Sequence, residues 1–147
     1  MNPAKINFYS ENDFILEDET VYTSWLESVI TSEAKKLEEL SYIFCDDEYL
    51  LKINMEYLDH DTYTDIITFD YSVGKILQGD IYVSTERVAE NADAFNVKFE
   101  DELRRVLVHG VLHLCGYKDK EESEAVLMRS KEEEKMQLFH VEQSKKS

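Results

Sequence analysis

The sequence contains little of what breaks or cross-links a chain: among its 147 residues there are one proline, four glycines and two cysteines. So few prolines and glycines leave little room for flexible linkers, and we expect a single domain over residues 1–142 followed by a frayed tail over residues 143–147. Cys45 and Cys115 have neither a C-x-x-C nor a paired spacing, which argues against a disulfide framework. We predict that both are small buried hydrophobic residues.

Long hydrophobic runs are also absent. No stretch approaches the roughly 18 consecutive apolar residues that a membrane-spanning helix needs. Residues 1–5 lack the apolar core of a signal peptide. These two absences lead us to expect a cytoplasmic protein.

Basic residues are scarce, with 16 lysines and arginines against 32 acidic residues and a formal charge of −16. A nucleic-acid-binding protein normally presents a basic surface to the phosphates, so this balance weighs against RNA or DNA as a partner. It does not exclude them, because a local basic patch or a bound dication can reverse the sign of the charge in one cleft.

Hydrophobic periodicity predicts four strands and five helices. The expected strands cover residues 5–10, 41–45, 66–71 and 79–84. The expected helices cover residues 19 to about 34, 46 to about 57, 85–95, about 100–115 and about 120–139. We expect the third and fourth strands to pair as a hairpin around Gly74, and Tyr49, Leu50, Ile53 and Tyr57 to share one face of the second helix.

The fourth predicted helix contains the most informative residues. Apolar residues form one stripe along it, and His109 and His113 lie one turn apart on the flank of that stripe. Gly116 is a typical helix-ending residue, and Asp119 follows in the loop, which gives the spacing H-x3-H-x5-D. Two nitrogens and one oxygen around a metal, with a fourth position open, are typical of catalytic rather than structural zinc sites.

Two other interpretations of this helix stay open. The two histidines could be core residues whose ring nitrogens bond to backbone carbonyls. A metallopeptidase would need the general-base glutamate of H-E-x-x-H, but Gly110 occupies that position. Gly110 would also allow a neighbouring element to approach the helix closely.

The segment His109–Tyr117 resembles the signature of the YbeY family, H-G-x-L-H-L-x-G-Y, at all seven fixed positions. Thr64–Phe69 is similar to the family's T-D-V-L-S-F strand, and Gly79–Ser84 is similar to its G-D-I-x-I-S strand. A downstream E-A-x-x-M pattern, beginning at Glu124, also matches the family. The order and spacing of these motifs agree over more than half of the chain.

This resemblance implies a single-domain α+β fold with a small mixed four-stranded sheet packed by about five helices. It also implies one bound zinc ion and metal-dependent hydrolysis of single-stranded RNA during maturation of ribosomal RNA. The implied partners are precursor ribosomal RNA and the small ribosomal subunit or its assembly factors. On this resemblance, His109, His113 and Asp119 are the expected metal ligands.

The sequence departs from the family at the third ligand, where the family usually has a histidine and this chain has Asp119. Aspartate is a competent zinc ligand, but its negative charge should make a coordinated water less acidic than three histidines would. We therefore expect the metal to be retained and the reactivity to be altered.

A second departure is Leu58, which stands where the family has an arginine thought to face the active cleft. Without that guanidinium another cation would have to hold a phosphate, and the candidates are Lys75, Arg87, Lys118 and Lys120. Asp65 and Asp80 could orient a water, although they could equally be turn-forming residues, and the sequence identifies no general base.

The missing arginine and the acidic charge also favour a non-catalytic ribosome-assembly factor in which the metal only stabilises the junction between helix and loop. That alternative predicts a fourth protein ligand that closes the site, whereas an enzyme needs an open position. His60 and His140 lie outside any ligand spacing, and we expect both to be surface residues.

Overall fold

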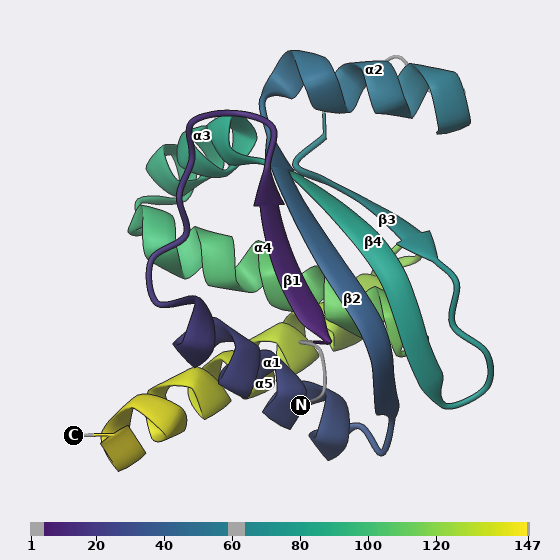
Figure 1. The fold of residues 1–147 in the computed structure, drawn as a ribbon, viewed down its shortest axis with the longest axis vertical. Helices are drawn as coiled ribbons and strands as arrows, with labels where there is room; N and C mark the ends of the chain where they lie inside the picture. The colour runs from purple at the N-terminus through teal and green to yellow at the C-terminus, as the bar shows by residue number, and fades with distance from the viewer. Residues whose placement is uncertain (1–4, 59–63, 147) are drawn as a thin grey trace.

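Within the residues that the structure describes, four strands form one mixed sheet and five helices pack around it (Figure 1). The structure is a computed structural model that describes residues 5–58 and 64–146, except for the side chains of residues 58 and 140–146. This is the single-domain α+β architecture predicted above. No helix among the described residues is both long and apolar enough to cross a membrane.

The sheet has the strand order β1-β2-β4-β3. β1 (Ile6–Ser10), β2 (Lys36–Cys45) and β4 (Ile76–Ser84) run parallel to one another, and β3 (Ile66–Asp70) pairs antiparallel with β4. The predicted hairpin of the third and fourth strands is therefore confirmed. Since β3 is the one antiparallel strand, the sheet is mixed.

Helices lie on both faces of this sheet. They are α1 (Glu19–Ser32), α2 (Asp47–Leu58), α3 (Thr85–Phe95), α4 (Phe99–Leu114) and α5 (Glu122–Lys146). The main core lies between one face of the sheet and α1, α4 and α5, and a smaller cluster lies between the other face and α2. The hydrophobic effect of burying these two sets of side chains holds the layers together.

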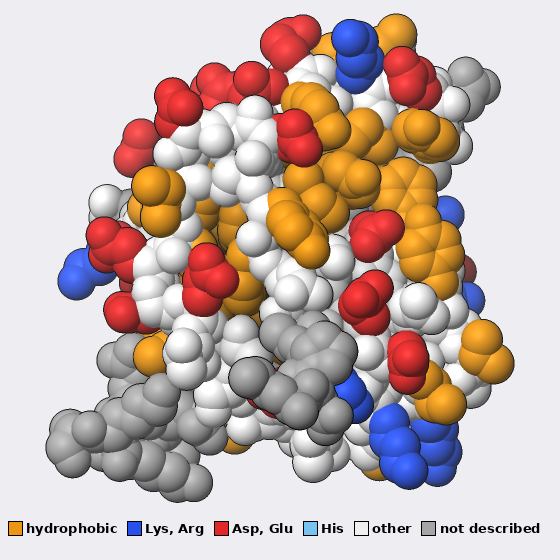
Figure 2. Space-filling view, viewed as in Figure 1, with side chains coloured by type: hydrophobic (Ala, Val, Ile, Leu, Met, Phe, Trp, Pro, Cys, Tyr) orange, Lys and Arg blue, Asp and Glu red, His pale blue; other side chains and the backbone are white. Residues whose placement is uncertain are grey.

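The four residues predicted to share one face of the second helix all lie on the side of α2 that faces the sheet. Leu50 and Ile53 of α2 are buried and pack on Ile67, as the predicted apolar face required. Tyr49 and Tyr57 are exposed. Figure 2 shows hydrophobic side chains gathered around α2 and the adjoining strands, with acidic side chains around them. Tyr49 nevertheless stacks on Tyr82 of β4, and Tyr57 packs edge-on against Phe69 of β3, so each ring contacts the sheet and keeps its other side in solvent.

Three elements are longer than predicted. β4 begins at Ile76 rather than at Gly79. β2 begins at Lys36 rather than near Ser41, because its charged first half pairs with β4 through the main chain while exposing most of its side chains. α5 continues to Lys146 rather than ending near Phe139, and four of its last five residues, Glu, Gln and two Lys, are good helix formers. The backbone of residues 143–146 is thus helical, and the domain boundary at residue 142 stays a prediction.

Both cysteines are free thiols. Cys45 is buried as predicted, but Cys115 is only half-buried because it lies at the solvent-facing end of α4. Burial raises the pKa of Cys45 to about 12 and that of Cys115 to about 11. Neither is therefore a reactive thiolate at neutral pH.

Two glycines allow α4 to lie close against the sheet. A Cβ atom on Gly110 of α4 would lie 2.8 Å from Cδ1 of Ile81 in β4, as the expected packing role of this glycine requires. A Cβ atom on Gly79 of β4 would lie 2.6 Å from the Phe69 carbonyl oxygen and 3.1 Å from Leu114 of α4. The absence of both side chains sets how closely the histidine-bearing helix approaches β3 and β4.

We expect Gly79→Ala to lower the free energy of unfolding by about 1–3 kcal/mol, because the new methyl group meets a backbone oxygen that cannot move independently of the strand. Gln78→Ala, at the exposed neighbouring position of β4, should change it by less than about 0.5 kcal/mol. Urea denaturation followed by circular dichroism measures both. Equal stability of Gly79→Ala and wild type would contradict the close packing described here.

Candidate metal site

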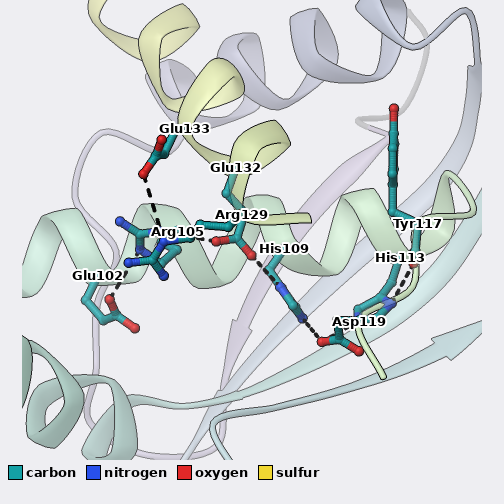
Figure 3. A network of polar contacts seen from close by, with 9 residues as sticks. All are labelled: Glu102, Arg105, His109, His113, Tyr117, Asp119, Arg129, Glu132 and Glu133. Atoms are coloured by element: carbon teal, nitrogen blue, oxygen red, sulfur yellow. Dashed lines mark hydrogen bonds and ion pairs between the residues drawn. The ribbon is translucent and has the colours of Figure 1, made fainter. Parts of the chain in front are cut away.

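Helix α4 places the two histidines side by side. His109 and His113 are one turn apart, and their ring centroids are 4.5 Å from each other, nearly perpendicular (Figure 3). Both rings are half-buried at the edge of the core. The arrangement follows from the i, i+4 spacing, because such side chains project from the same side of a helix.

A left-handed glycine ends α4 and reverses the chain. Gly116 has a φ of 110°, and its N–H donates to the carbonyl of His113 at 3.0 Å. The N–H of Tyr117 donates to the carbonyl of Leu112, also at 3.0 Å. This pair of bonds is a Schellman motif, which satisfies the last carbonyls of a helix and favours glycine at the left-handed position. The predicted helix end at Gly116 is confirmed.

The reversed chain brings Asp119 back to the two histidines. Its Oδ2 atom lies 3.2 Å from Nε2 of His109 and 3.5 Å from Nε2 of His113. One ligand atom from each of the three residues lies within 4.8 Å of the others. The structure thus gathers the three residues that the sequence singled out into a group that could hold a metal ion.

The second nitrogen of each ring is already bonded. Nδ1 of His109 donates to the Glu132 carboxylate at 2.6 Å, and Nδ1 of His113 donates to the backbone carbonyl of Tyr117 at 3.0 Å. A carboxylate and a carbonyl can only accept, which assigns the proton of each neutral ring to Nδ1. Both Nε2 lone pairs therefore face the same point, as a metal site requires.

The two imidazoles differ in acidity. Burial lowers the pKa of His109, but the Glu132 hydrogen bond and the charges of Glu132 and Asp119 raise it more strongly, so its pKa lies above the ordinary value. The pKa of His113 is lowered, first by burial and then by the charge on His109. A metal binds only the neutral rings, so proton competition at this site falls mainly on His109.

Glu132 is the functional residue that the sequence analysis missed. It lies on α5 with only 5% of its surface exposed, and it also accepts from Nη1 of Arg105 at 3.2 Å (Figure 3). A signal for it exists in the sequence, because Met128, Glu132, Lys135 and Phe139 share the buried stripe of α5. An acidic residue on such a stripe needs a buried partner, which here is His109.

The two aspartates proposed to orient water, Asp65 and Asp80, line different cavities. Asp65 lines a cavity of about 290 Å³ together with His109 and Asp119. Burial raises the pKa of Asp65, although the charge of His109 opposes this. Asp80 lines a separate groove with α2 on the opposite face of the sheet. The structure therefore joins Asp65 but not Asp80 to the histidine group.

The four cations proposed to hold a phosphate lie in different surroundings. Arg87 is bound to Asp47 and Glu90, both at 2.8 Å, and so links α3 to the start of α2. Lys118 and Lys120 are exposed on either side of Asp119, and Lys75 is exposed in the turn before β4. The side chains of Leu58 and His140, and the whole of His60, lie outside the described residues.

Among the residues that the structure describes, no fourth histidine, cysteine or acid completes the ligand group. The group thus leaves a coordination position for water or substrate. Two imidazole nitrogens and one carboxylate oxygen suit zinc, a borderline ion that binds nitrogen and oxygen ligands with four-coordinate geometry.

Comparison with known proteins agrees with these motifs. The sequence model of the family described as Endoribonuclease YbeY matches residues 6–140. The chain belongs to the YbeY family. A relative from Christiangramia forsetii, named Endoribonuclease YbeY, is 64% identical over 97% of this chain and 100% of its own length. A relative of the same name from Flavobacterium johnsoniae is 63% identical over 94% of this chain and 99% of its own.

Solved structures of related proteins share the fold. The solution structure of a Thermotoga maritima protein is 26% identical to this chain, has a TM-score of 0.68, and covers 96% of this chain and 93% of its own. The YbeY membership and the shared fold together confirm the resemblance drawn from the motifs.

We expect Glu132→Gln to weaken zinc binding about 10- to 100-fold, because the amide is a weaker acceptor for the His109 ring than the carboxylate. Glu133→Gln, the exposed neighbour on α5, is the matched control and should bind zinc like wild type. Competition against a chromogenic chelator measures both affinities. Unchanged affinity in Glu132→Gln would refute the orienting role of Glu132.

Proposed function

We propose that this protein is a metal-dependent endoribonuclease that cuts single-stranded RNA. The observation that carries the proposal is the convergence of two Nε2 atoms and one carboxylate oxygen within 4.8 Å. Identity of 64% to a protein named Endoribonuclease YbeY supports phosphodiester hydrolysis as the reaction. Histidine, histidine and aspartate with an open position are the donors of a hydrolytic rather than a structural site.

In this proposal His109, His113 and Asp119 hold one zinc ion. When bound, the zinc supplies Lewis acidity, which polarises a phosphate oxygen and makes a coordinated water more acidic. Glu132 and the Tyr117 carbonyl fix the two rings so that their Nε2 atoms face the metal. These two hydrogen bonds reduce the reorganisation that metal binding would otherwise require.

Asp65 is the residue from which a reacting water could be oriented. It lines the cavity that also contains His109 and Asp119, and burial raises its pKa. We propose Asp65 as a positioning residue for water and assign it no proton transfer.

The acidic composition gives the metal a second role. With a formal charge of −16 the protein repels polyanions in general, so a dication is needed to attract a phosphate to this cavity.

We propose precursor ribosomal RNA as the substrate, the small ribosomal subunit or its assembly factors as partners, and the cytoplasm as the location. The basis of these finer assignments is the family resemblance.

Two other functions have weaker support. A non-catalytic assembly factor would be favoured by a closed metal site, but the described residues supply only three ligands. A metallopeptidase of the H-E-x-x-H type needs a glutamate where Gly110 packs against Ile81.

We expect His113→Ala and Asp119→Ala to lose both bound zinc and RNA cleavage, because two ligands cannot retain the ion. Glu121→Ala, which removes an exposed acid from the same loop, should keep about one zinc per chain and full activity. Elemental mass spectrometry on protein purified without a metal-affinity tag gives the zinc content. Zinc-free wild type, or full cleavage by Asp119→Ala, would contradict the proposal.

Asp119→His should retain zinc and shift the pH dependence of cleavage. It removes one negative charge from the ligand set, so we expect the pH of half-maximal rate to fall relative to wild type. Initial rates on a single-stranded RNA between pH 5 and 9 measure this shift. An upward shift would exclude the ligand charge as the controlling factor.

A further inference from the structure

The cavity beside the metal ligands contains more than the proposed catalytic group. It lies between the end of α3, the middle of α4 and the start of α5, and its volume is about 290 Å³. His109 and Asp119 line it together with Arg129 and Phe95. Ligand pockets begin at about 300 Å³, so this cavity suits one small unit rather than a long segment.

A bound metal ion would change the cavity from one that repels a phosphate to one that accepts it. Four carboxylates (Asp65, Glu102, Asp119 and Glu132) and two guanidiniums (Arg105 and Arg129) line it, which leaves a formal charge of about −2. A bound dication would cancel that charge. A phosphate would therefore be repelled before metal binding and accepted afterwards.

The two arginines that line the cavity differ in how firmly their charges are paired within the protein. Arg105 lies 3.2 Å from Glu132 and 3.6 Å from Glu102, and both acids are buried, so its charge is used within the protein. Arg129 contacts Glu133 at 3.9 Å, and its side chain is 58% exposed. An exposed pair of this kind contributes little and is readily exchanged for a phosphate.

Figure 3 shows Arg129 on α5 next to Arg105 and Glu132, on the side of the network away from Asp119. The Arg129 guanidinium thus lies on the side of His109 opposite to Asp119 (Figure 3). An arginine fork matches the geometry of a phosphate and would engage one without displacing a metal ligand.

Phe95 adds an aromatic surface to the same cavity. It is the last residue of α3, and 59% of it is exposed. Asn91, one helical turn earlier, also lines the cavity. An exposed ring beside a cation is the combination on which single-stranded nucleic acids are held, since every base can stack on it.

We propose that this cavity is a nucleotide subsite, in which Arg129 binds a phosphate of the RNA strand next to the metal and Phe95 stacks on a base. The proposal rests on the function proposed above and supplies the cation that is missing at Leu58. None of the four cations considered in the sequence analysis lines this cavity.

A second aromatic groove of about 460 Å³ lies between α2 and the opposite sheet face. It contains Tyr49, Tyr57, Phe69 and Tyr82, but its acids Glu56 and Asp80 outnumber its one cation, Lys52. The metal ligands lie on α4, which covers the other face. The proposed metal would therefore not offset the acids of this groove, and the groove serves as the internal comparison.

The test measures binding of a short, fluorescein-labelled 2′-O-methyl RNA to zinc-loaded protein by fluorescence anisotropy, with the intactness of the probe checked on a gel. We expect Arg129→Ala to weaken binding about 5- to 20-fold and Phe95→Ala about 5- to 100-fold. Lys52→Ala, which removes the same charge from the opposite groove, should bind like wild type.

Salt dependence separates a phosphate contact from a structural effect. Loss of one phosphate contact lowers the slope of log affinity against log salt by about 0.7 for a single strand, which we expect for Arg129→Ala. Phe95→Ala should keep the wild-type slope, and Arg129→Lys should restore it. Zinc content should stay at the wild-type level in all these variants, because none of them removes a metal ligand.

The outcomes distinguish the subsite from the proposed function. If wild type cleaves unmodified RNA and both variants bind and cleave like it, the subsite is wrong and the function stands. Weaker RNA binding by Lys52→Ala than by Arg129→Ala would place the RNA strand in the groove on the opposite face of the sheet. It would also overturn the proposed subsite. If zinc-loaded wild type cleaves no RNA but binds the probe through Arg129 and Phe95, the function is wrong and the subsite stands.

Discussion

The close approach of α4 to β4 is the constraint on which the rest of the site depends. Gly110 and Gly79 remove the two side chains that would hold the helix away from the sheet. At this distance the apolar stripe of α4 is fully buried, and the flank that carries His109 and His113 lies at the edge of the core. The rings are then exposed enough to bind a ligand and buried enough to need hydrogen-bond partners from other elements.

Those partners come from two different parts of the chain. The Tyr117 carbonyl reaches His113 because the Schellman turn folds the loop back over the end of α4, and the Tyr117 hydroxyl donates to Glu33, the residue that caps the end of α1, at 2.7 Å. Glu132 reaches His109 because α5 packs across α4. Each imidazole is thus oriented by a different neighbour, which links the geometry of the site to the packing of three helices.

The sequence predicts the local part of this site and not the long-range part. His109, His113 and Asp119 could be identified because helical spacing and a capping glycine determine their relation within one short segment. The apolar stripe of α5 marks Glu132 as an acid that needs a partner, but it does not identify that partner or place Arg129. Both depend on how α5 crosses α4, and no periodicity in the chain gives that angle. The same reason explains why the predicted start of β2 was too late. The charged first residues of β2 form a strand only because β4 lies beside them. The shared face of α2 could likewise be predicted from helical spacing, but the exposure of Tyr49 and Tyr57 on that face could not, because it depends on how the helix lies on the sheet.

All three proposed ligands lie in one continuous stretch, His109–Asp119. A metal that joins residues so close in sequence closes only a short loop, so it removes little conformational entropy from the unfolded chain. Some of its affinity would also survive in the unfolded chain, which further limits the stability that it adds. The ion would thus act as an exchangeable reagent seated on an already folded domain, and the enzyme could gain or lose it with the supply of metal while its fold persists.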